Sequence, residues 1–174
     1  MSVEAVPPMT ANSFVPNSDY SRAFRNALGQ FGTGVAIVTT ATERGNVGIT
    51  ANSFASVSLD PPLVLWSPAK SSKRYDAFTQ AQRYAIHLLA HEQRHICHMF
   101  VKNGDRFDDL SWNMSENNVP LIEQCLAIFE CQQHAVHDAG DHAIVVGRVE
   151  RTTLNKGNPL LFFGGAYGEF NPSG

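Results

Sequence analysis

The sequence predicts a mainly β fold with short helices, organised around a largely antiparallel sheet that can close into a barrel. Runs of β-branched and aromatic residues indicate about seven strands, against three short helices. Most links between these runs are too short for the crossovers that parallel strands require. The chain has 174 residues, 43% of them hydrophobic, which suits one domain with a single core.

The N-terminal part predicts a leader followed by a helix. Residues 1–17 contain three prolines among small polar residues and predict a flexible leader, with a single domain over residues 18–174. Ser18 or Asp19 can cap a helix, and a following glycine can end it. Large apolar side chains recur there at helical spacing: Tyr20, Phe24, Leu28 and Phe31.

The rest of the chain alternates strands with two short helices. Strands are expected over residues 35–40, 47–59, 63–67, 84–90, 130–136, 142–153 and 159–163. A serine-capped helix is expected over residues 71–78 and another over residues 91–100. Residues 138–141 form the expected hairpin turn between two long strands.

Composition narrows the classes of function. A net charge of -3 and a pI near 6.1 give no reason to expect nucleic acid or an acidic membrane surface as a partner. The sequence has no secretion signal and no stretch near the roughly 20 apolar residues of a membrane span, so we expect a cytoplasmic protein. Its three cysteines form no CxxC pair and are expected to be reduced core thiols.

The short motifs argue against a dinucleotide-binding loop, a serine hydrolase and a Walker-type nucleotide site, and they leave zinc hydrolysis open. The glycines within residues 29–34 have the wrong spacing and place for a dinucleotide-binding loop, and G-x-S-x-G and Walker motifs are missing. His91, Glu92 and His95 match the H-E-x-x-H pattern of zinc hydrolases. However, Arg94 puts a cation inside that turn and no third ligand is marked. The competing interpretation is a solvated helix face.

The segment Thr50–Ser58 is rich in small hydroxyl and amide side chains. Such a strand can bring its backbone and short side chains within hydrogen-bond reach of a flat heterocycle. A sheet with one solvated face would explain the same composition. Hydride transfer between two bound rings needs few acid–base groups, so the lack of a catalytic dyad is compatible with redox chemistry.

From this segment outward the sequence resembles the flavin reductase family, the small reductase components of two-component flavin monooxygenases. The matching pieces follow in order over roughly residues 20–170: FRNALGQFGTGVAIVTT (24–40), GITANSFASVSLDPPLVLWSPAKSS (48–72), DRF (105–107), ECQQ (130–133), AGDHAIVVGRVE (139–150) and PLLFFGGAYG (159–168). The resemblance implies an FMN-binding split β-barrel, FMN or FAD as cofactor, and NADH or NADPH as cosubstrate. It also implies a homodimer, no metal, and a partner monooxygenase that receives reduced flavin.

The resemblance also implies which residues contact the flavin. The T-A-N-S-F stretch and a nearby serine line the ring and ribityl chain: Thr50, Ala51, Asn52, Ser53 and Ser56. Ser71, Ser72 and Lys73 match the region that approaches the flavin phosphate, where a helix N-terminus and a lysine supply donors and positive charge.

On the nicotinamide side, the resemblance places His142 beside the flavin as a positioning residue, with Asp141 next to it. Tyr167 matches a tyrosine near the nucleotide site, and Arg106 and Phe107 belong to a loop of the same region. Residues 162–164 depart from the family pattern, because many relatives carry tyrosines and an arginine there.

These observations lead to an expected function with two alternatives. The first expectation is NAD(P)H:flavin oxidoreductase activity that supplies reduced flavin to a monooxygenase. A flavin carrier without turnover is the first alternative. Zinc hydrolysis through His91, Glu92 and His95 is the second.

Overall fold

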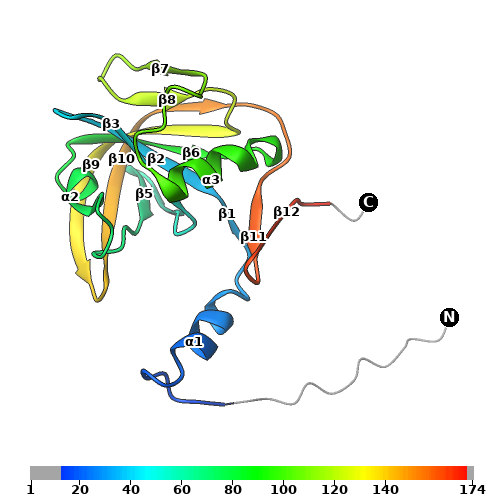
Figure 1. Ribbon diagram of the computed structural model, residues 1–174. Coiled ribbons are helices and arrows are strands. Elements are labelled where there is room, and N and C mark those ends of the chain that lie inside the picture. The colour runs from blue at the N-terminus through cyan, green and yellow to red at the C-terminus, as the bar shows by residue number, and fades with distance from the viewer. Residues whose placement is uncertain (1–12, 172–174) are drawn as a thin grey trace.

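A seven-stranded antiparallel sheet forms the body of the protein. The structure is a computed structural model, and it describes residues 13–171. The strands of this sheet are β2 (Ala36–Thr42), β3 (Gly45–Ala51), β4 (Ala55–Leu59), β5 (Pro62–Trp66), β6 (Arg83–Leu88), β9 (Ala127–Ala139) and β10 (His142–Leu154). Their order is β3-β2-β6-β9-β10-β5-β4 (Figure 1). Because β3 and β4 are the two edges of this order, the described sheet is not closed. The mainly β, antiparallel prediction is confirmed.

Two small sheets and three α-helices complete the described chain. A three-stranded sheet joins β1 (Thr33–Gly34), β11 (Leu161–Phe163) and β12 (Ala166–Gly168), and a separate hairpin joins β7 (Trp112–Met114) and β8 (Pro120–Ile122). The helices are α1 (Ser21–Leu28), α2 (Tyr75–Thr79) and α3 (Arg94–Lys102), the last preceded by a 3-10 turn, η1 (His91–Gln93). The sequence did not predict β1, β7, β8 or β12, because two or three residues are too few to show a strand period.

The core has two parts because the central strands are covered on both faces. Trp66, Phe78 and Tyr84 are fully buried in one part, and Phe100 belongs to the other, which α3 covers. β2 contributes alternate residues to both, with Ile37 beside Phe100 in the part under α3. This double burial explains why β2 begins with three consecutive apolar residues, Ala36, Ile37 and Val38. The three cysteines are free and buried, as expected.

Two expected elements differ from the structure. The strand expected over residues 47–59 is two strands, because the chain leaves the sheet at Asn52 and re-enters it at Ala55, so that β3 and β4 lie at opposite edges. The helix expected from residue 71 begins only at Tyr75. The hydroxyl of Ser72 instead accepts the backbone N–H of Arg74 at 3.2 Å, in the turn that precedes α2.

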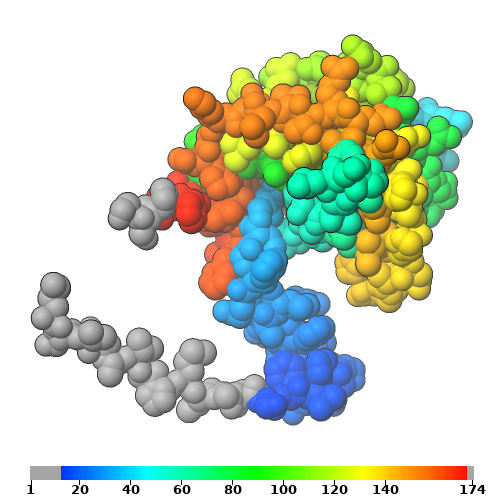
Figure 2. Space-filling view, turned by 180° about the vertical axis from the view of Figure 1, so that it is seen from behind, coloured from blue at the N-terminus to red at the C-terminus, as the bar shows by residue number. Residues whose placement is uncertain are grey.

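Helix α1 projects away from the barrel (Figures 1 and 2). No residue of Ser21–Leu28 is buried, and Phe31, just beyond the helix, is 78% exposed. The expected cap at Ser18 or Asp19 is not formed. The side-chain oxygen of Asn17 instead accepts the backbone N–H groups of Asp19 and Tyr20, just before the helix. Most of the expected leader lies outside the described residues. No helix within residues 13–171 is long and apolar enough to cross a membrane.

Candidate flavin and nucleotide site

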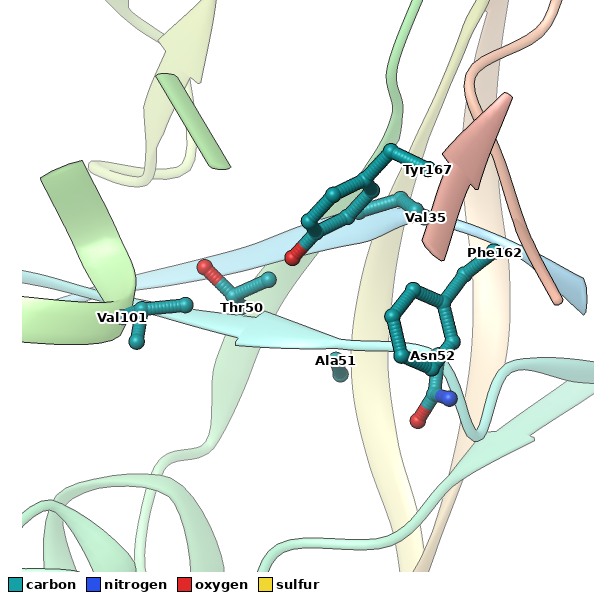
Figure 3. Close-up of a pocket in the computed structure, with 7 residues that line it drawn as sticks. All are labelled: Val35, Thr50, Ala51, Asn52, Val101, Phe162 and Tyr167. Atoms are coloured by element: carbon teal, nitrogen blue, oxygen red, sulfur yellow. The ribbon is translucent and has the colours of Figure 1, made fainter. Parts of the chain in front are cut away.

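A pocket of about 280 Å³ opens between β3, the end of α3 and the β11–β12 hairpin. Seven residues line it: Val35, Thr50, Ala51, Asn52, Val101, Phe162 and Tyr167 (Figure 3). Two large aromatic side chains and several smaller apolar and polar groups therefore enclose the space. This combination suits a flat, largely apolar ring with a polar edge.

The floor of the pocket is the end of edge strand β3. Thr50 donates its hydroxyl hydrogen to the backbone oxygen of Cys97 at 2.9 Å, which attaches β3 to α3. Its hydroxyl oxygen keeps acceptor capacity toward the pocket. Ala51 adds only a methyl group, and Asn52 follows at the point where the chain leaves the sheet with its carboxamide exposed. The floor thus offers a close-fitting surface with a donor and an acceptor at one end.

Tyr167 forms the opposite wall, and α3 holds it in place. Its hydroxyl lies 3.1 Å from the thiol of Cys97, and the guanidinium carbon of Arg94 lies 5.1 Å from its ring centroid. The His98 ring meets it edge-on at 5.3 Å, and Phe162 packs against it at 5.2 Å. Burial, followed by the bond with Cys97, raises the pKa of Tyr167 to about 12. The phenol therefore stays protonated at neutral pH.

The turn that contains Ser71, Ser72 and Lys73 lies beside this pocket and is not part of its lining. Arg74, the next residue, donates to the backbone oxygens of Gly48 at 2.9 Å and Phe100 at 2.6 Å. Gly48 is in β3, and Phe100 is in the last turn of α3. Arg74 therefore ties the turn to both elements that form the pocket.

His142 lies at the start of β10, outside the lining of the pocket. Its Nδ1 is 2.7 Å from the Asp141 carboxylate, and this hydrogen bond holds the pKa of Asp141 below its usual value. The His142 backbone pairs with Ala69, and Ser53 bonds through its hydroxyl to the N–H of Ser67 at 2.9 Å. His142, Asp141 and Ser53 are therefore connected through the segment that follows β5, and none of them lines the pocket.

The remaining expected site residues lie apart from the pocket lining. Phe107 is 5% exposed and packs in the core against Phe100 at 5.2 Å. Arg106 is exposed and pairs with Asp109 at 2.7 Å. Ser56 is exposed on edge strand β4.

Sequence reasoning missed several residues that shape the pocket: Val35, Val101 and Phe162 in its lining, and Arg94, Cys97 and His98 behind Tyr167. Phe162 belongs to the expected strand 159–163, PLLFF, which is apolar throughout, so no alternation marks the side that faces the pocket. The contact between α3 and Tyr167 joins segments about 70 residues apart, and no local pattern marks it.

The H-E-x-x-H residues do not form a larger ligand cluster. His95 Nδ1 lies 3.2 Å from the backbone oxygen of Glu92, within its own turn. Over residues 13–171, no group of three or more His, Cys, Asp or Glu side chains is placed to hold a metal ion.

Comparison with known proteins gives consistent matches. The family model described as "Flavin reductase like domain" matches residues 28–171. The chain is 54% identical over 169 residues to "FMN reductase (NADH) SmoA" of Agrobacterium fabrum, and the match covers 97% of each. It is 47% identical to the reductase component of the flavin-dependent trigonelline monooxygenase of Acinetobacter baylyi, covering 87% of this chain and 49% of that protein. The chain thus spans about half the length of that relative.

Solved structures of flavin reductases also match this chain. The NADH:FAD oxidoreductase SgcE6 of Streptomyces globisporus aligns with a TM-score of 0.87 and 32% identity, over 94% of this chain and 100% of that one. The neighbouring structures are flavin reductases, which confirms the expected split-barrel fold. The pocket, the fold and these matches together show that the chain belongs to the flavin reductase-like family.

Proposed function

We propose that the protein is an NAD(P)H:flavin oxidoreductase that moves a hydride from a nicotinamide nucleotide to FMN or FAD. The observation that carries this proposal is the pocket over Thr50, Ala51 and Asn52, walled by Tyr167 and Phe162, in a chain similar to an FMN reductase that uses NADH. The flavin, when bound, supplies the hydride acceptor, so the protein has to bind and orient two rings and keep water out.

The residues of the pocket fit a flavin ring. The exposed Asn52 carboxamide carries both a donor and an acceptor, which matches the alternating polar edge of the isoalloxazine. The rings of Phe162 and Tyr167 flank the cavity and exclude water from its apolar side. Ser71, Ser72 and Lys73 are proposed to meet the flavin phosphate from their turn, which Arg74 fixes beside the pocket. They act there as loop groups, since α2 starts only at Tyr75.

His142 is proposed to orient the nicotinamide ring. Asp141 holds its imidazole by Nδ1, which leaves Nε2 free to contact the nucleotide. Hydride transfer needs no proton at the reacting carbon, so the imidazole has a positioning role. Ser53 is proposed to act indirectly, because its hydroxyl holds the segment that leads to His142. No contact places the other expected residues at the flavin ring or the nicotinamide ring: Ser56, Arg106 and Phe107.

A homodimer and a monooxygenase partner are part of the proposal. Helix α1 leaves Phe24, Leu28 and Phe31 uncovered, and a second copy of the chain is the proposed cover. Two relatives are named as reductase components of monooxygenases, which supports a partner that consumes reduced flavin. The cytoplasm, where NADH is turned over, is the proposed location. Sedimentation velocity tests the dimer: Phe31→Ser should yield monomer, and a wild-type monomer would contradict the interface.

Anaerobic mixing tests the chemical step. The protein is saturated with FMN, NADH is added, and the absorbance of oxidised flavin is followed. The proposal expects rapid bleaching with one NADH consumed per flavin. Flavin that binds tightly and is not reduced faster than free FMN would indicate a carrier.

A further inference from the structure

One face of α3 presents positive charge beside the pocket. The helix sequence is RHICHMFVK, so residues 94–102 contain no carboxylate. Arg94, His98 and Lys102 recur one helical turn apart and are exposed. Among residues 13–171, none of these three pairs with an Asp or Glu side chain within 4.0 Å. The protein as a whole carries a net charge of -3, which makes this uncompensated basic face a local feature.

The packing of Tyr167 places Arg94 and His98 next to the wall of the pocket. Arg94 lies over the Tyr167 ring and His98 against its edge, at 5.1 and 5.3 Å. Val101, one turn beyond His98, is part of the pocket lining. Arg94 and His98 therefore pack on the ring that walls the cavity, and Val101 of the same helix lines that cavity (Figure 3). Stacking on the ring restricts the guanidinium and leaves its N–H groups available to an anion.

The two ends of α3 are distinct. Its C-terminal end is bonded by Arg74, next to the turn proposed to bind the flavin phosphate. Arg94 is at the other end, one helix length away. A second nucleotide whose ring stacks on the flavin has phosphates of its own to place, and Arg94 lies at the end of α3 away from Arg74.

We propose that Arg94, with His98, binds the pyrophosphate of the nicotinamide nucleotide. This inference rests on the proposed function and names the part of the second substrate that α3 recognises. Arg94 supplies a planar, permanently charged donor that matches phosphate oxygens, and Tyr167 keeps it in place. The Tyr167 ring thus lines the cavity and also carries the stacked guanidinium of Arg94.

ADP-ribose is the probe, because it carries the pyrophosphate without a nicotinamide ring. Calorimetric titration of the flavin-saturated protein should show binding that weakens about tenfold in Arg94→Ala and less in Arg94→Lys. Arg44→Ala is the matched control: Arg44 is exposed in the β2–β3 turn, at the end of β3 far from Thr50, and its loss should change nothing. In steady-state assays, the KM for NADH should rise in Arg94→Ala. The ratio of the Kd values of FMN and riboflavin should stay unchanged, because Arg94 contacts the Tyr167 wall and not the flavin phosphate.

Three outcomes would overturn the proposal. The first is wild-type protein that does not bind ADP-ribose, and the second is equal binding by wild type and Arg94→Ala. The third is a loss of FMN affinity in Arg94→Ala without loss of riboflavin affinity, which would assign the basic face to the flavin phosphate. If wild type binds ADP-ribose through Arg94 but fails to oxidise NADH, the proposed function fails and this site stands.

Discussion

His87 links the stability of the barrel to pH through one buried imidazole. It is fully buried in β6, with Nδ1 3.0 Å from the backbone oxygen of Ile37 and Nε2 accepting the N–H of Ile122 at 3.1 Å. Both contacts are satisfied only by a neutral ring with its proton on Nδ1. A second proton would remove the acceptor for Ile122 and charge a dry core. Burial accordingly lowers the pKa of His87 to about 4.

The magnitude follows from that shift. The unfolded chain takes up the proton near pH 6.5 and the folded chain only near pH 4. Unfolding is therefore favoured progressively as the pH falls between these values, and stability is complete above the unfolded pKa. At about 1.4 kcal/mol per pKa unit, the contribution lost is about 2 kcal/mol by pH 5 and about 3 kcal/mol at its limit.

Urea unfolding between about pH 7.5 and pH 5 measures this effect in wild type and in His87→Gln. The carboxylates titrate in both proteins, so the difference between the two pH profiles isolates His87. Wild type should lose about 2 kcal/mol more than the variant over that range. Parallel profiles, with equal losses in both proteins, would refute the neutral buried imidazole.

Three further predictions concern the site and its frame. Asn52→Ala should weaken FMN binding about fivefold with little change in the KM for NADH. His142→Ala should raise the KM for NADH with little change in FMN binding. Equal losses in both properties would mean that the variants only damage the fold. Gly48→Ala should lower the free energy of unfolding by about 1–3 kcal/mol, because its new methyl group would overlap the fully buried ring of Phe100; an unchanged urea midpoint would contradict this packing. Arg74→Met leaves the carbonyls of Gly48 and Phe100 without their donor and should lower the free energy of unfolding by about 2 kcal/mol. Fluorescence titration should show that it weakens the binding of FMN more than that of riboflavin. Equal weakening for both flavins would mean that Arg74 does not support the phosphate turn.

The main strands were predictable because they are rich in β-branched residues, and three neighbouring pairs, β2–β3, β4–β5 and β9–β10, are consecutive in the sequence. β9 and β10 are thirteen residues each and meet at a tight turn where Gly140 has a φ of +67°, as the turn residues suggest. The break at Asn52 was not predictable from composition. The residues on both sides of it favour strands, and only the curvature of the barrel decides that β3 and β4 part there.

Only part of the site could be predicted from the sequence. The floor residues Thr50, Ala51 and Asn52 are consecutive, so a local pattern marks them. The wall depends on Tyr167 meeting Cys97 and Arg94, which lie in another part of the chain. Such contacts arise from tertiary packing and leave no local signature. Phe107 shows the converse, because its loop position indicates exposure while two aromatic neighbours bury it.

Steady-state oxidation of NADH and NADPH, each with FMN, FAD and riboflavin, tests the central claim most directly. The purified protein is compared with a control that contains flavin and nucleotide alone. The account predicts rapid oxidation that requires added flavin, and the six combinations identify the preferred pair. Folded protein that binds flavin but oxidises neither nucleotide with any flavin would contradict the reductase and leave a flavin carrier.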